Sequence, residues 1–359
     1  MDVRNRGELV SDAIRHPRVL VISLGGTIAS SNADASSGVV TPSLSARDLV
    51  EAVTQLDELA TVETVGFRQI PSGDLTLGDL VELAALIDVR LAGDVDGVVV
   101  TQGTDTIEES AFALDLLVHS SLPVVVTGAM RNPTQAGPDG PANLLAAVRV
   151  AASIQARGLG TLVVFNDEIH AARFVRKTHS TSPATFHSPN AGPIGWVVED
   201  RVRIVLRVDR LSTVGPLDGA DVAPVALLKC TIGDEGRLLR ELVSSGYRGV
   251  VIEGFGGGHV PSAMVPAIEA LAQQIPVVLA SRTGSGELLA KTYGFRGSET
   301  DLLSRGVQSA GVLDGLKSRV LLSLAIAASD NASVREATFV RVRDCVAGER
   351  DPAALSASD

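Results

Sequence analysis

Hydroxyl side chains that directly follow short apolar runs are the first residues in this sequence whose type and position suit chemistry. Thr27 stands behind two glycines in the segment LGGTIAS, after the apolar run that begins at Val19. The glycines would let the backbone approach a ligand, and a threonine hydroxyl becomes a nucleophile when a neighbouring group activates it. A lone GGT segment is more often a tight turn, and it matches neither the GxGxxG nor the Walker A spacing. Thr27 is therefore a candidate nucleophile, and this interpretation depends on whether other residues of the chain could activate it.

A second polar loop lies in the segment QGTDTIEES, which begins at Gln102. Thr104 and Asp105 stand there at the predicted start of a helix, where backbone N–H groups and the helix dipole favour negative charge. Ordinary N-capping accounts for one of these two side chains and less well for both. We predict that Asp105 receives a substrate ammonium group and that Thr104 donates or accepts a proton.

Lys177 is the candidate that links this threonine and this carboxylate. It lies in NDEIHAARFVRKTHSTSPATF, which begins at Asn166, within a threonine-rich stretch that follows an apolar run. Most lysines are surface charges. Held near Asp105, however, a lysine ammonium would orient the carboxylate and tune Thr104, as a Thr-Lys-Asp relay requires.

Other catalytic chemistries lack their usual sequence patterns. The GxSxG elbow and the SxxK motif of serine hydrolases are absent from the chain. The histidines His170, His179 and His187 are nine and eight residues apart, without HExxH spacing or neighbouring cysteines. The two cysteines, Cys230 and Cys345, are best interpreted as small core residues. We therefore predict neither a metal site nor an organic cofactor.

The elements that must position these side chains are predicted from apolar runs that alternate with helical patterns. Valine-rich runs ending in glycine or a small polar residue begin at Arg18, Asp96, Leu122 and Gly160. Helices between them have recognisable starts, with a hydroxyl followed three positions later by an acid: Ser45 with Asp48, Thr76 with Asp79, and Thr106 with Glu109. This alternation predicts an α/β fold with a doubly wound parallel sheet. Ligands bind such sheets beyond the carboxyl ends of the strands, which is where the hydroxyl-rich loops lie.

The same pattern repeats in a second block, which predicts a smaller C-terminal α/β domain. RGVVIEGFGGG from Arg248 and IPVVLASRTG from Ile275 are similar to the runs at Asp96 and Leu122. A stretch rich in Gly, Pro and Asp separates the two blocks. We predict an N-terminal extension at 1–17, a larger domain carrying the catalytic loops at 18–212, a linker at 213–225, a smaller domain at 226–348 and a tail at 349–359.

Composition excludes several classes of partner. The formal net charge is −11, and both nucleic acids and anionic membranes attract basic surfaces. No apolar run approaches the roughly 20 residues needed to cross a bilayer. Charged residues also interrupt the N-terminal segment, where a secretion signal would carry its apolar region. We predict a cytoplasmic protein that acts on a small molecule, with no nucleic-acid or membrane partner.

Loop motifs carry a resemblance that covers nearly the whole chain. In order they are GGTIAS at Gly25, IPSGDLT at Ile70, QGTDT at Gln102, TGAMR at Thr127, NDEIHAARFVRKTHST at Asn166 and SRTGSGELLAKTYGF at Ser281. Together they resemble the bacterial-type L-asparaginase (asparaginase/glutaminase) family, from about Arg18 to about Val340. Chance agreement at this many ordered loops is implausible.

The resemblance implies a hydrolase that attacks a side-chain amide through a threonine. Thr27 matches the nucleophile of the family. Thr104, Asp105 and Lys177 match a second catalytic cluster. The resemblance implies no metal and no cofactor.

Substrate-binding positions are implied by the same resemblance. Ser72 and Asp105 match residues that hold the α-carboxylate and α-amino groups of the substrate, and Ala129 matches a residue whose backbone carbonyl faces the leaving amide. Glu287 aligns with an acid contributed by a neighbouring subunit, which implies a homodimer or homotetramer. Gly73 departs from the family, because many members carry glutamine there against the α-carboxylate. Losing a hydrogen bond to a charged group costs about 1.5–3 kcal/mol, which predicts substrate binding weaker by about ten- to a hundredfold.

Val40 is a second departure from the family. Secreted members place a tyrosine about thirteen residues after the nucleophile and hydrogen-bonded to it, whereas this chain has Val40 there. The group that activates Thr27 is then Thr41, a water molecule or the second cluster.

These observations predict an L-asparagine amidohydrolase that releases L-aspartate and ammonia through an acyl-enzyme on Thr27. Two alternatives remain open. One is a glutaminase-type amidotransferase subunit, which is disfavoured because relatives of that kind carry an extra N-terminal domain. The other is a weakly catalytic amino-acid binding protein, which Val40 and Gly73 would favour.

Overall fold

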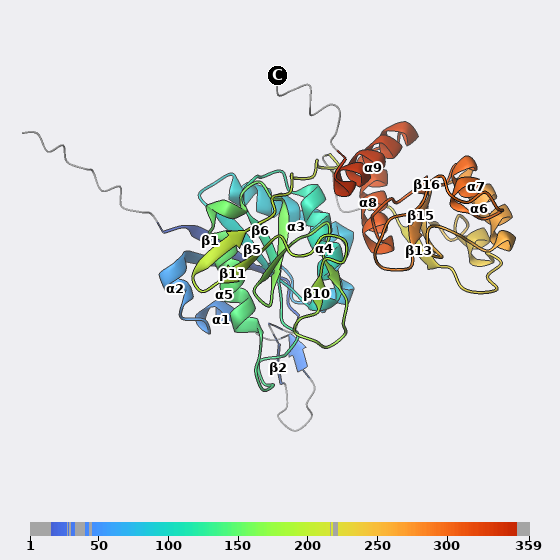
Figure 1. Ribbon diagram of the computed structural model, residues 1–359. Coiled ribbons are helices and arrows are strands. Elements are labelled where there is room, and N and C mark those ends of the chain that lie inside the picture. Colours follow the sequence, from blue (N-terminus) through green and yellow to red (C-terminus); the bar gives the residue numbers. More distant parts are fainter. Residues whose placement is uncertain are drawn as a thin grey trace, which may run out of the picture.

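The computed structural model describes residues 16–26, 28, 30–32, 40–42, 45–215, 217 and 222–349, with the backbone alone for 30–32 and 40–42. Within these residues the chain forms a larger and a smaller α/β domain (Figure 1). The larger domain contains an eight-stranded sheet and the smaller one a four-stranded sheet. The fold class predicted from the sequence is confirmed.

Five parallel strands form the centre and one edge of the larger sheet. In spatial order they are β4 (Thr61–Gly66), β1 (Arg18–Ser23), β5 (Gly97–Thr101), β6 (Val124–Thr127) and β7 (Thr161–Phe165). Apart from the edge strand β4 they are almost completely buried, as parallel strands covered by helices on both faces must be.

The other edge of this sheet is antiparallel, a feature that the sequence analysis did not predict. It consists of β8 (Glu168–Ala171), β11 (Gly195–Val198) and β12 (Arg201–Ile204). The chain reverses from β7 into β8 through Asn166 and Asp167, whose φ angles are 51° and 61°. Asn and Asp adopt this left-handed conformation more readily than other side chains, so two residues suffice for the turn.

Helices cover both faces of the larger sheet because residues alternate between the faces along each strand. Leu20 and Ile22 of β1 share a core with α3 (Leu77–Leu91) and α4 (Ile107–Leu117). Val19 and Val21 share the opposite core with α1 (Ala46–Glu51), α2 (Leu56–Leu59) and α5 (Gly140–Ala151). This is the doubly wound arrangement expected from the apolar pattern.

Two of the three predicted capping boxes are confirmed. Both reciprocal hydrogen bonds are present in the pairs Ser45–Asp48 and Thr76–Asp79. The third prediction is wrong, because the side chain of Thr106 makes no capping hydrogen bond. Its hydroxyl donates instead to the backbone oxygen of Ser72 at 3.1 Å, so Thr106 joins two loops.

The smaller domain lies against the larger one through a helix. Its parallel sheet has the order β13 (Val225–Lys229), β14 (Gly249–Gly254), β15 (Val277–Ser281) and β16 (Gln308–Ser309). The described helices of this domain are α6 (Val265–Ala272), α7 (Glu299–Ser304), α8 (Gly315–Ala328) and α9 (Ala332–Ala347). Helix α8 packs on β13 and β14 and also on α4 of the larger domain (Figure 1). One continuous apolar core therefore joins the two domains.

The predicted domain borders stay a prediction. The described residues between β12 and β13 form neither helix nor strand. Residues 216 and 218–221 of the predicted linker lie outside the described residues, as do 1–15 of the predicted extension and 350–359 of the predicted tail.

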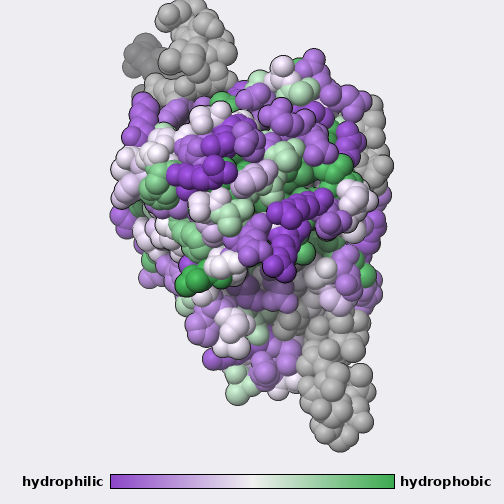
Figure 2. All heavy atoms as spheres, turned by 90° about the vertical axis from the view of Figure 1, so that its right-hand side faces the viewer, coloured by the Kyte–Doolittle hydropathy of each residue, from purple (hydrophilic) through white to green (hydrophobic). Residues whose placement is uncertain are grey.

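The surface of the smaller domain is mixed in character. Figure 2 shows this side of the molecule, with hydrophilic residues spread across it and hydrophobic ones in small groups. Large hydrophobic residues of this domain that are exposed include Ile232, Leu238, Leu289, Tyr293 and Phe295. None of the described helices is long and apolar enough to cross a membrane.

Candidate active site

The loops that carry the predicted site residues leave the larger sheet at a common level. Ser23, at the end of β1, pairs in register with Gly66 of β4 and with Thr101 of β5. Thr101 pairs in turn with Thr127 of β6. The Leu24 N–H then donates to the Thr101 carbonyl at 2.9 Å, which continues the register by one residue. The residues that follow each strand therefore meet at the carboxyl edge of the sheet, where ligands bind.

The two glycines before Thr27 turn the chain tightly against the QGTDT loop. Gly25 and Gly26 have φ angles of 99° and 87°. A Cβ on Gly26 would lie 2.1 Å from the backbone nitrogen of Gly103, and one on Gly25 would lie 2.8 Å from the Ile70 carbonyl oxygen. Conformation and space both exclude side chains here. Thr27, the predicted nucleophile, lies outside the described residues.

Ser72 lies against the same loop. It begins the 3₁₀ turn Ser72–Asp74 and is buried. A Cβ on Gly103 would lie 2.7 Å from the Ser72 hydroxyl oxygen, so only a glycine in the loop allows this approach. Ser72 is thereby placed between the end of β4 and the loop that follows β5.

The structure brings Lys177 together with Thr104 and Asp105. The Lys177 Nζ donates to Thr104 Oγ1 at 2.9 Å and to Asp105 Oδ1 at 2.6 Å. The Lys177 side chain is 11% exposed and that of Asp105 is 80% exposed. The ammonium is thus largely shielded from water, while the carboxylate stays accessible to a ligand. The helix N-caps at this point are Gly103 and Thr106, so capping does not explain Thr104 or Asp105.

The ammonium group changes what Thr104 can do chemically. Because Lys177 donates to the threonine oxygen, the hydroxyl proton of Thr104 is directed toward another acceptor. The positive charge also stabilises negative charge that develops on this oxygen during proton transfer. The exposed carboxylate of Asp105 can also accept hydrogen bonds from a cationic group.

Ala129 is held by a network that the sequence analysis did not single out. Asn143 of α5 is buried, donates to the Gly128 carbonyl at 3.0 Å and accepts the Asn166 N–H at 3.0 Å. A Cβ on Gly128 would lie 2.6 Å from the Gln102 carbonyl oxygen, so this turn packs directly on the QGTDT loop. The sequence signal for Asn143 is a lone amide among the apolar residues of its helix.

Gln102 is a further residue that the sequence analysis missed. Its buried side chain donates to the Gly103 carbonyl at 3.2 Å and to the Thr106 hydroxyl at 3.3 Å. Its carbonyl oxygen accepts the Ser110 hydroxyl at 2.8 Å. These bonds stabilise the loop from within and so help to position Thr104.

Among the residues that the structure describes, no group of three or more His, Cys, Asp or Glu is arranged to hold a metal ion. The ring nitrogens of His170 lie 2.9 Å from the Ser188 hydroxyl and 3.2 Å from the Glu168 carboxylate. Burial lowers the pKa of His170, which favours the neutral ring. His170 is therefore accounted for as a hydrogen-bonded core residue.

Two protein-family models match the sequence over ranges that include all of these loops. The family described as "Asparaginase, N-terminal" matches residues 18–210, and "Glutaminase/Asparaginase C-terminal domain" matches residues 224–339. The chain belongs to the asparaginase family. It is accordingly an amidohydrolase.

Individual members of the asparaginase family match over most of their length. An L-asparaginase of Bacillus licheniformis is 36% identical over 86% of this chain and 95% of its own. A probable periplasmic L-asparaginase of Haemophilus influenzae is 34% identical over 93% of this chain and 95% of its own. The crystal structure of a probable cytoplasmic L-asparaginase from Campylobacter jejuni has a TM-score of 0.80 and 29% identity, covering 90% of this chain and 99% of that chain.

Three positions at which the family resemblance raised questions have different environments. Gly73 is exposed, and a Cβ there would meet no atom within 4 Å. Val40 begins β3 (Val40–Pro42), which pairs antiparallel with β2 (Ser30–Asn32), and its side chain lies outside the described residues, as does that of Thr41. Glu287 is exposed on the loop after β15 in the smaller domain, and its role at a subunit boundary stays a prediction.

Proposed function

We propose that this member of the asparaginase family hydrolyses L-asparagine to L-aspartate and ammonia with Thr27 as the nucleophile. In the first step the Thr27 hydroxyl oxygen bonds to the side-chain carbonyl carbon, the C–N bond breaks and ammonia leaves with the transferred proton. In the second step water attacks the resulting ester, which releases aspartate and restores the threonine. The scheme uses no metal and no cofactor.

The observation that carries this proposal is the contact of Lys177 with both Thr104 and Asp105. The shielded ammonium polarises the Thr104 hydroxyl, which donates its proton to the leaving amine in the first step and takes a proton from the attacking water in the second. Asp105 is open to the solvent and takes the α-ammonium of the substrate. Asparagine carries both an α-ammonium group and a side-chain amide, which suits this pairing.

The remaining substrate groups are assigned to the neighbouring loops. Ser72 binds the α-carboxylate, and the Ala129 carbonyl accepts a hydrogen bond from the leaving amide. The backbone N–H groups of Thr27 and Thr104 stabilise the oxyanion of the tetrahedral intermediate. One such donor is worth about 2.7–4 kcal/mol where it has been removed.

Ammonia release from L-asparagine by the purified protein tests this function. We expect Thr27→Ala to abolish release and Thr27→Ser to retain part of it, because serine keeps the hydroxyl. Thr61→Ala, at an exposed position on β4, is the matched control and should release ammonia at the wild-type rate. Hydroxylamine should intercept the ester of the wild type and yield aspartate hydroxamate.

Two results would contradict the proposal. Undiminished ammonia release by Thr27→Ala would exclude Thr27 as the nucleophile. Asparagine binding in calorimetry without any ammonia release would favour the binding-protein alternative. A comparison of L-asparagine with L-glutamine, as the ratio of their kcat/KM values, measures which amide the site prefers.

We also propose that the chain acts as a homodimer or homotetramer in the cytoplasm. Exposed aromatic residues on the smaller domain, Tyr293 and Phe295, support self-association, since such residues are enriched in interfaces. Cys230 is a buried free thiol, as is usual in a reducing compartment. Light scattering of the purified protein and fractionation of the cells test these two statements.

A further inference from the structure

Lys177 lies on a short ribbon outside the eight-stranded sheet. Strand β9 (Arg176–Lys177) pairs antiparallel with β10 (Phe186–His187), and each strand has only two residues. An isolated two-stranded ribbon has little stability of its own, and shorter ones have less. The position of the Lys177 ammonium therefore depends on what holds the residues beside it.

The larger domain holds this ribbon through Glu108 in the first turn of α4. The Glu108 carboxylate lies 3.7 Å from the Arg176 guanidinium, and the backbone N–H of Lys177 is among the groups that lower its pKa. Burial is the main influence on this carboxyl and raises its pKa. Glu108 follows Thr104 and Asp105 closely in the chain, so it ties β9 to the loop that Lys177 must reach.

The smaller domain holds the residue two positions before Lys177. The Lys317 Nζ on α8 donates to the Val175 carbonyl at 2.7 Å and to the Asp314 carboxylate at 3.2 Å, and the Lys317 side chain is only 2% exposed. Asp314 is also the N-cap of α8 and accepts the Lys317 N–H at 2.9 Å. Burial alone would raise the pKa of Asp314, but the charges of Lys317 and Arg176 and this N–H bond lower it. Asp314 is therefore a carboxylate that holds both cations.

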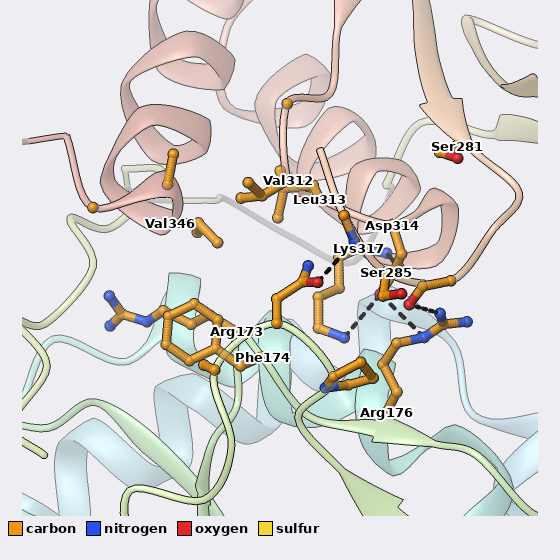
Figure 3. Close-up of a pocket in the computed structure, with 18 residues that line it drawn as sticks. Arg173, Phe174, Arg176, Ser281, Ser285, Val312, Leu313, Asp314, Lys317 and Val346 are labelled. Atoms are coloured by element: carbon orange, nitrogen blue, oxygen red, sulfur yellow. Dashed lines mark hydrogen bonds and ion pairs between the residues drawn. The ribbon is translucent and has the colours of Figure 1, made fainter. Parts of the chain in front are cut away.

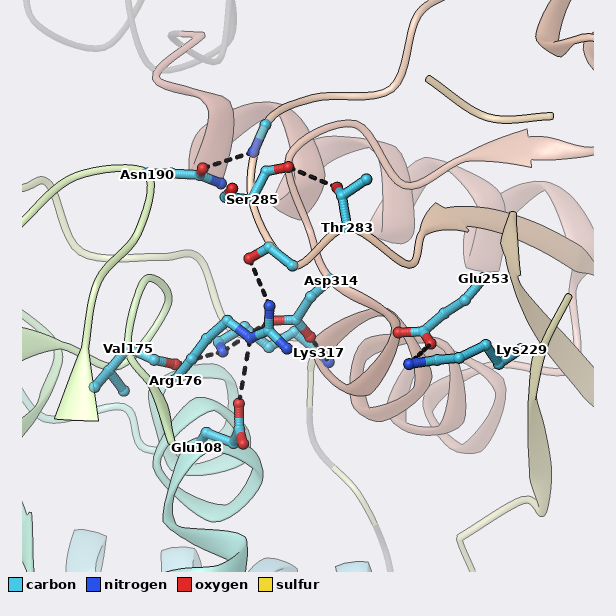
Figure 4. A network of polar contacts seen from close by, with 12 residues as sticks. Glu108, Val175, Arg176, Asn190, Lys229, Glu253, Thr283, Ser285, Asp314 and Lys317 are labelled. Atoms are coloured by element: carbon cyan, nitrogen blue, oxygen red, sulfur yellow. Dashed lines mark hydrogen bonds and ion pairs between the residues drawn. The ribbon is translucent and has the colours of Figure 1, made fainter. Parts of the chain in front are cut away.

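Arg176, the residue directly before Lys177, is also bound to the smaller domain. Its guanidinium donates to the Gly284 carbonyl and lies 3.6 Å from the Asp314 carboxylate. Figure 4 shows the guanidinium between Glu108 of the larger domain and the Asp314–Lys317 pair of the smaller one. Arg176 therefore bridges the two domains at the strand that carries Lys177.

Arg176, Asp314 and Lys317 form part of the wall of a cavity of about 260 Å³ between the domains (Figure 3). The charges of Lys317 and Arg176 are balanced by Asp314 and Glu108 within the protein. Their arrangement suits a strut between domains better than a receptor for an anion, because a ligand would have to compete with carboxylates already in place.

We propose that Arg176 and Lys317 form an interdomain brace that positions Lys177 for its action on Thr104. The inference rests on the proposed role of Lys177 in the reaction. Successive side chains of a strand point to opposite sides, so Arg176 faces the smaller domain while Lys177 faces Thr104. A shift of Arg176 would therefore move Lys177. A misplacement of about 1 Å in a catalytic group costs about a hundredfold in rate.

Two brace variants and one matched control test this role through turnover. Arg176→Gln and Lys317→Met should each lower kcat by about ten- to a hundredfold. Arg319→Gln is the control, since Arg319 lies on the same helix, donates to the Val225 carbonyl at 3.0 Å and lies 3.7 Å from Glu109 across the domain interface. It does not contact the strand of Lys177 and should keep kcat within about twofold of the wild type.

A readout on Lys177 itself separates positioning from a general loss of structure. The side-chain NMR signal of Lys177, in protein with isotope-labelled lysine, is assigned by its disappearance in Lys177→Met. We expect it to move toward the signals of exposed lysines in Arg176→Gln and Lys317→Met, and to stay in place in Arg319→Gln. In the Lys177→Met background, Arg176→Gln should cause no further loss of turnover, because the brace acts through Lys177.

The outcomes distinguish the brace from the proposed function. An unmoved Lys177 signal in both brace variants, or losses of turnover that add to that of Lys177→Met, would overturn the brace. A moved signal together with wild-type turnover in Lys177→Met would uphold the brace and remove Lys177 from the reaction. If Lys317→Met fails to fold, Arg176→Gln still decides, since the Arg176 side chain is 27% exposed and tolerates an amide.

Discussion

A shielded ammonium beside an exposed carboxylate is the central arrangement at the scale of single residues. Lys177 is largely buried, and the cost of removing its charge from water is offset by Asp105 and by the Thr104 hydroxyl. Asp105 keeps most of its surface in solvent and so remains available for a ligand. The pair therefore combines a shielded cation held against Thr104 with an anion that stays accessible.

Replacement of Lys177 by methionine should lower kcat by about a hundredfold or more, since it removes a charged donor from the oxygen of Thr104. The steady-state rate of ammonia release measures this. Lys229→Met is the matched control, because the Lys229 side chain is 62% exposed and lies 3.2 Å from Glu253 in the smaller domain. Equal turnover in the two variants would mean that Lys177 has a structural role and takes no part in the reaction.

Gly73 is an open position where a longer side chain should strengthen substrate binding. We expect Gly73→Gln to lower KM by about ten- to a hundredfold, because an amide there can donate to the α-carboxylate of the substrate. No atom lies within 4 Å of a Cβ at Gly73, so the fold should tolerate the change. Gly93→Gln, at a position where a Cβ meets only the Arg90 and Val89 carbonyl oxygens at 3.4 and 4.0 Å, should leave KM unchanged. An unaltered KM in Gly73→Gln would place the substrate carboxylate elsewhere.

At the scale of elements, the glycine turn after β1 decides how closely two loops approach. Gly26→Ala should abolish activity and lower Tm strongly, because its Cβ would lie 2.1 Å from the Gly103 nitrogen. Gly158→Ala is the matched control, with a φ of 74° and no atom within 4 Å. It should cost only the conformational strain of about 1–2 kcal/mol. Thermal unfolding and ammonia release together measure both effects, and a wild-type Tm in Gly26→Ala would show that the loops can separate freely.

Helix α4 carries acids whose stability contribution depends on pH. Burial raises the pKa of Glu108, Glu109 and Asp115. A carboxyl with a raised pKa in the folded state favours folding at low pH, and this contribution is lost as the pH rises through that pKa. Glu109→Gln, which stays neutral at every pH, should therefore gain Tm relative to the wild type at about pH 8, on the order of 2 °C, and lose this advantage near about pH 4. A difference in Tm that is the same at both pH values would contradict this account.

At the scale of the whole molecule, the smaller domain has two roles in these proposals. Within its own chain it braces the strand of Lys177 through α8. Toward a second chain it presents exposed aromatic side chains and Glu287. The first role depends on the buried interface between the domains, and the second depends on self-association.

Mixing two inactive variants tests whether sites are shared between subunits. Thr27→Ala and Glu287→Ala should each lose activity as pure oligomers. If Glu287 acts in the partner's site, a mixed dimer has one intact site, with Thr27 from one chain and Glu287 from the other. Refolding the variants together at equal amounts should then restore about a quarter of the wild-type turnover, as random pairing requires. No recovery, in a mixture shown by light scattering to reassemble, would mean that each chain completes its own site.

Patterns of neighbouring residues in the sequence determined the central strands, two helix starts and the family of this protein. Valine-rich runs predicted β1, β5, β6 and β7 and their parallel arrangement, because side chains buried on both faces of a strand must all be apolar. Ser45 and Thr76 capped their helices as predicted, since a capping box depends on residues only three positions apart. The ordered loop motifs also indicated the family, which the family models confirm.

Tertiary structure alone decided which distant residues meet. Thr106 has the sequence pattern of a helix cap, yet its hydroxyl donates a hydrogen bond to the backbone carbonyl of Ser72. Asn143 looks like an ordinary polar residue until packing places its side-chain amide against the Gly128 carbonyl, 15 positions earlier in the chain. The contact of Lys317 with Val175 spans 142 residues and two domains, and no local periodicity encodes it. Such contacts follow from how the sheets and helices pack, because the free energy that fixes them comes from burying apolar surface within and between the domains.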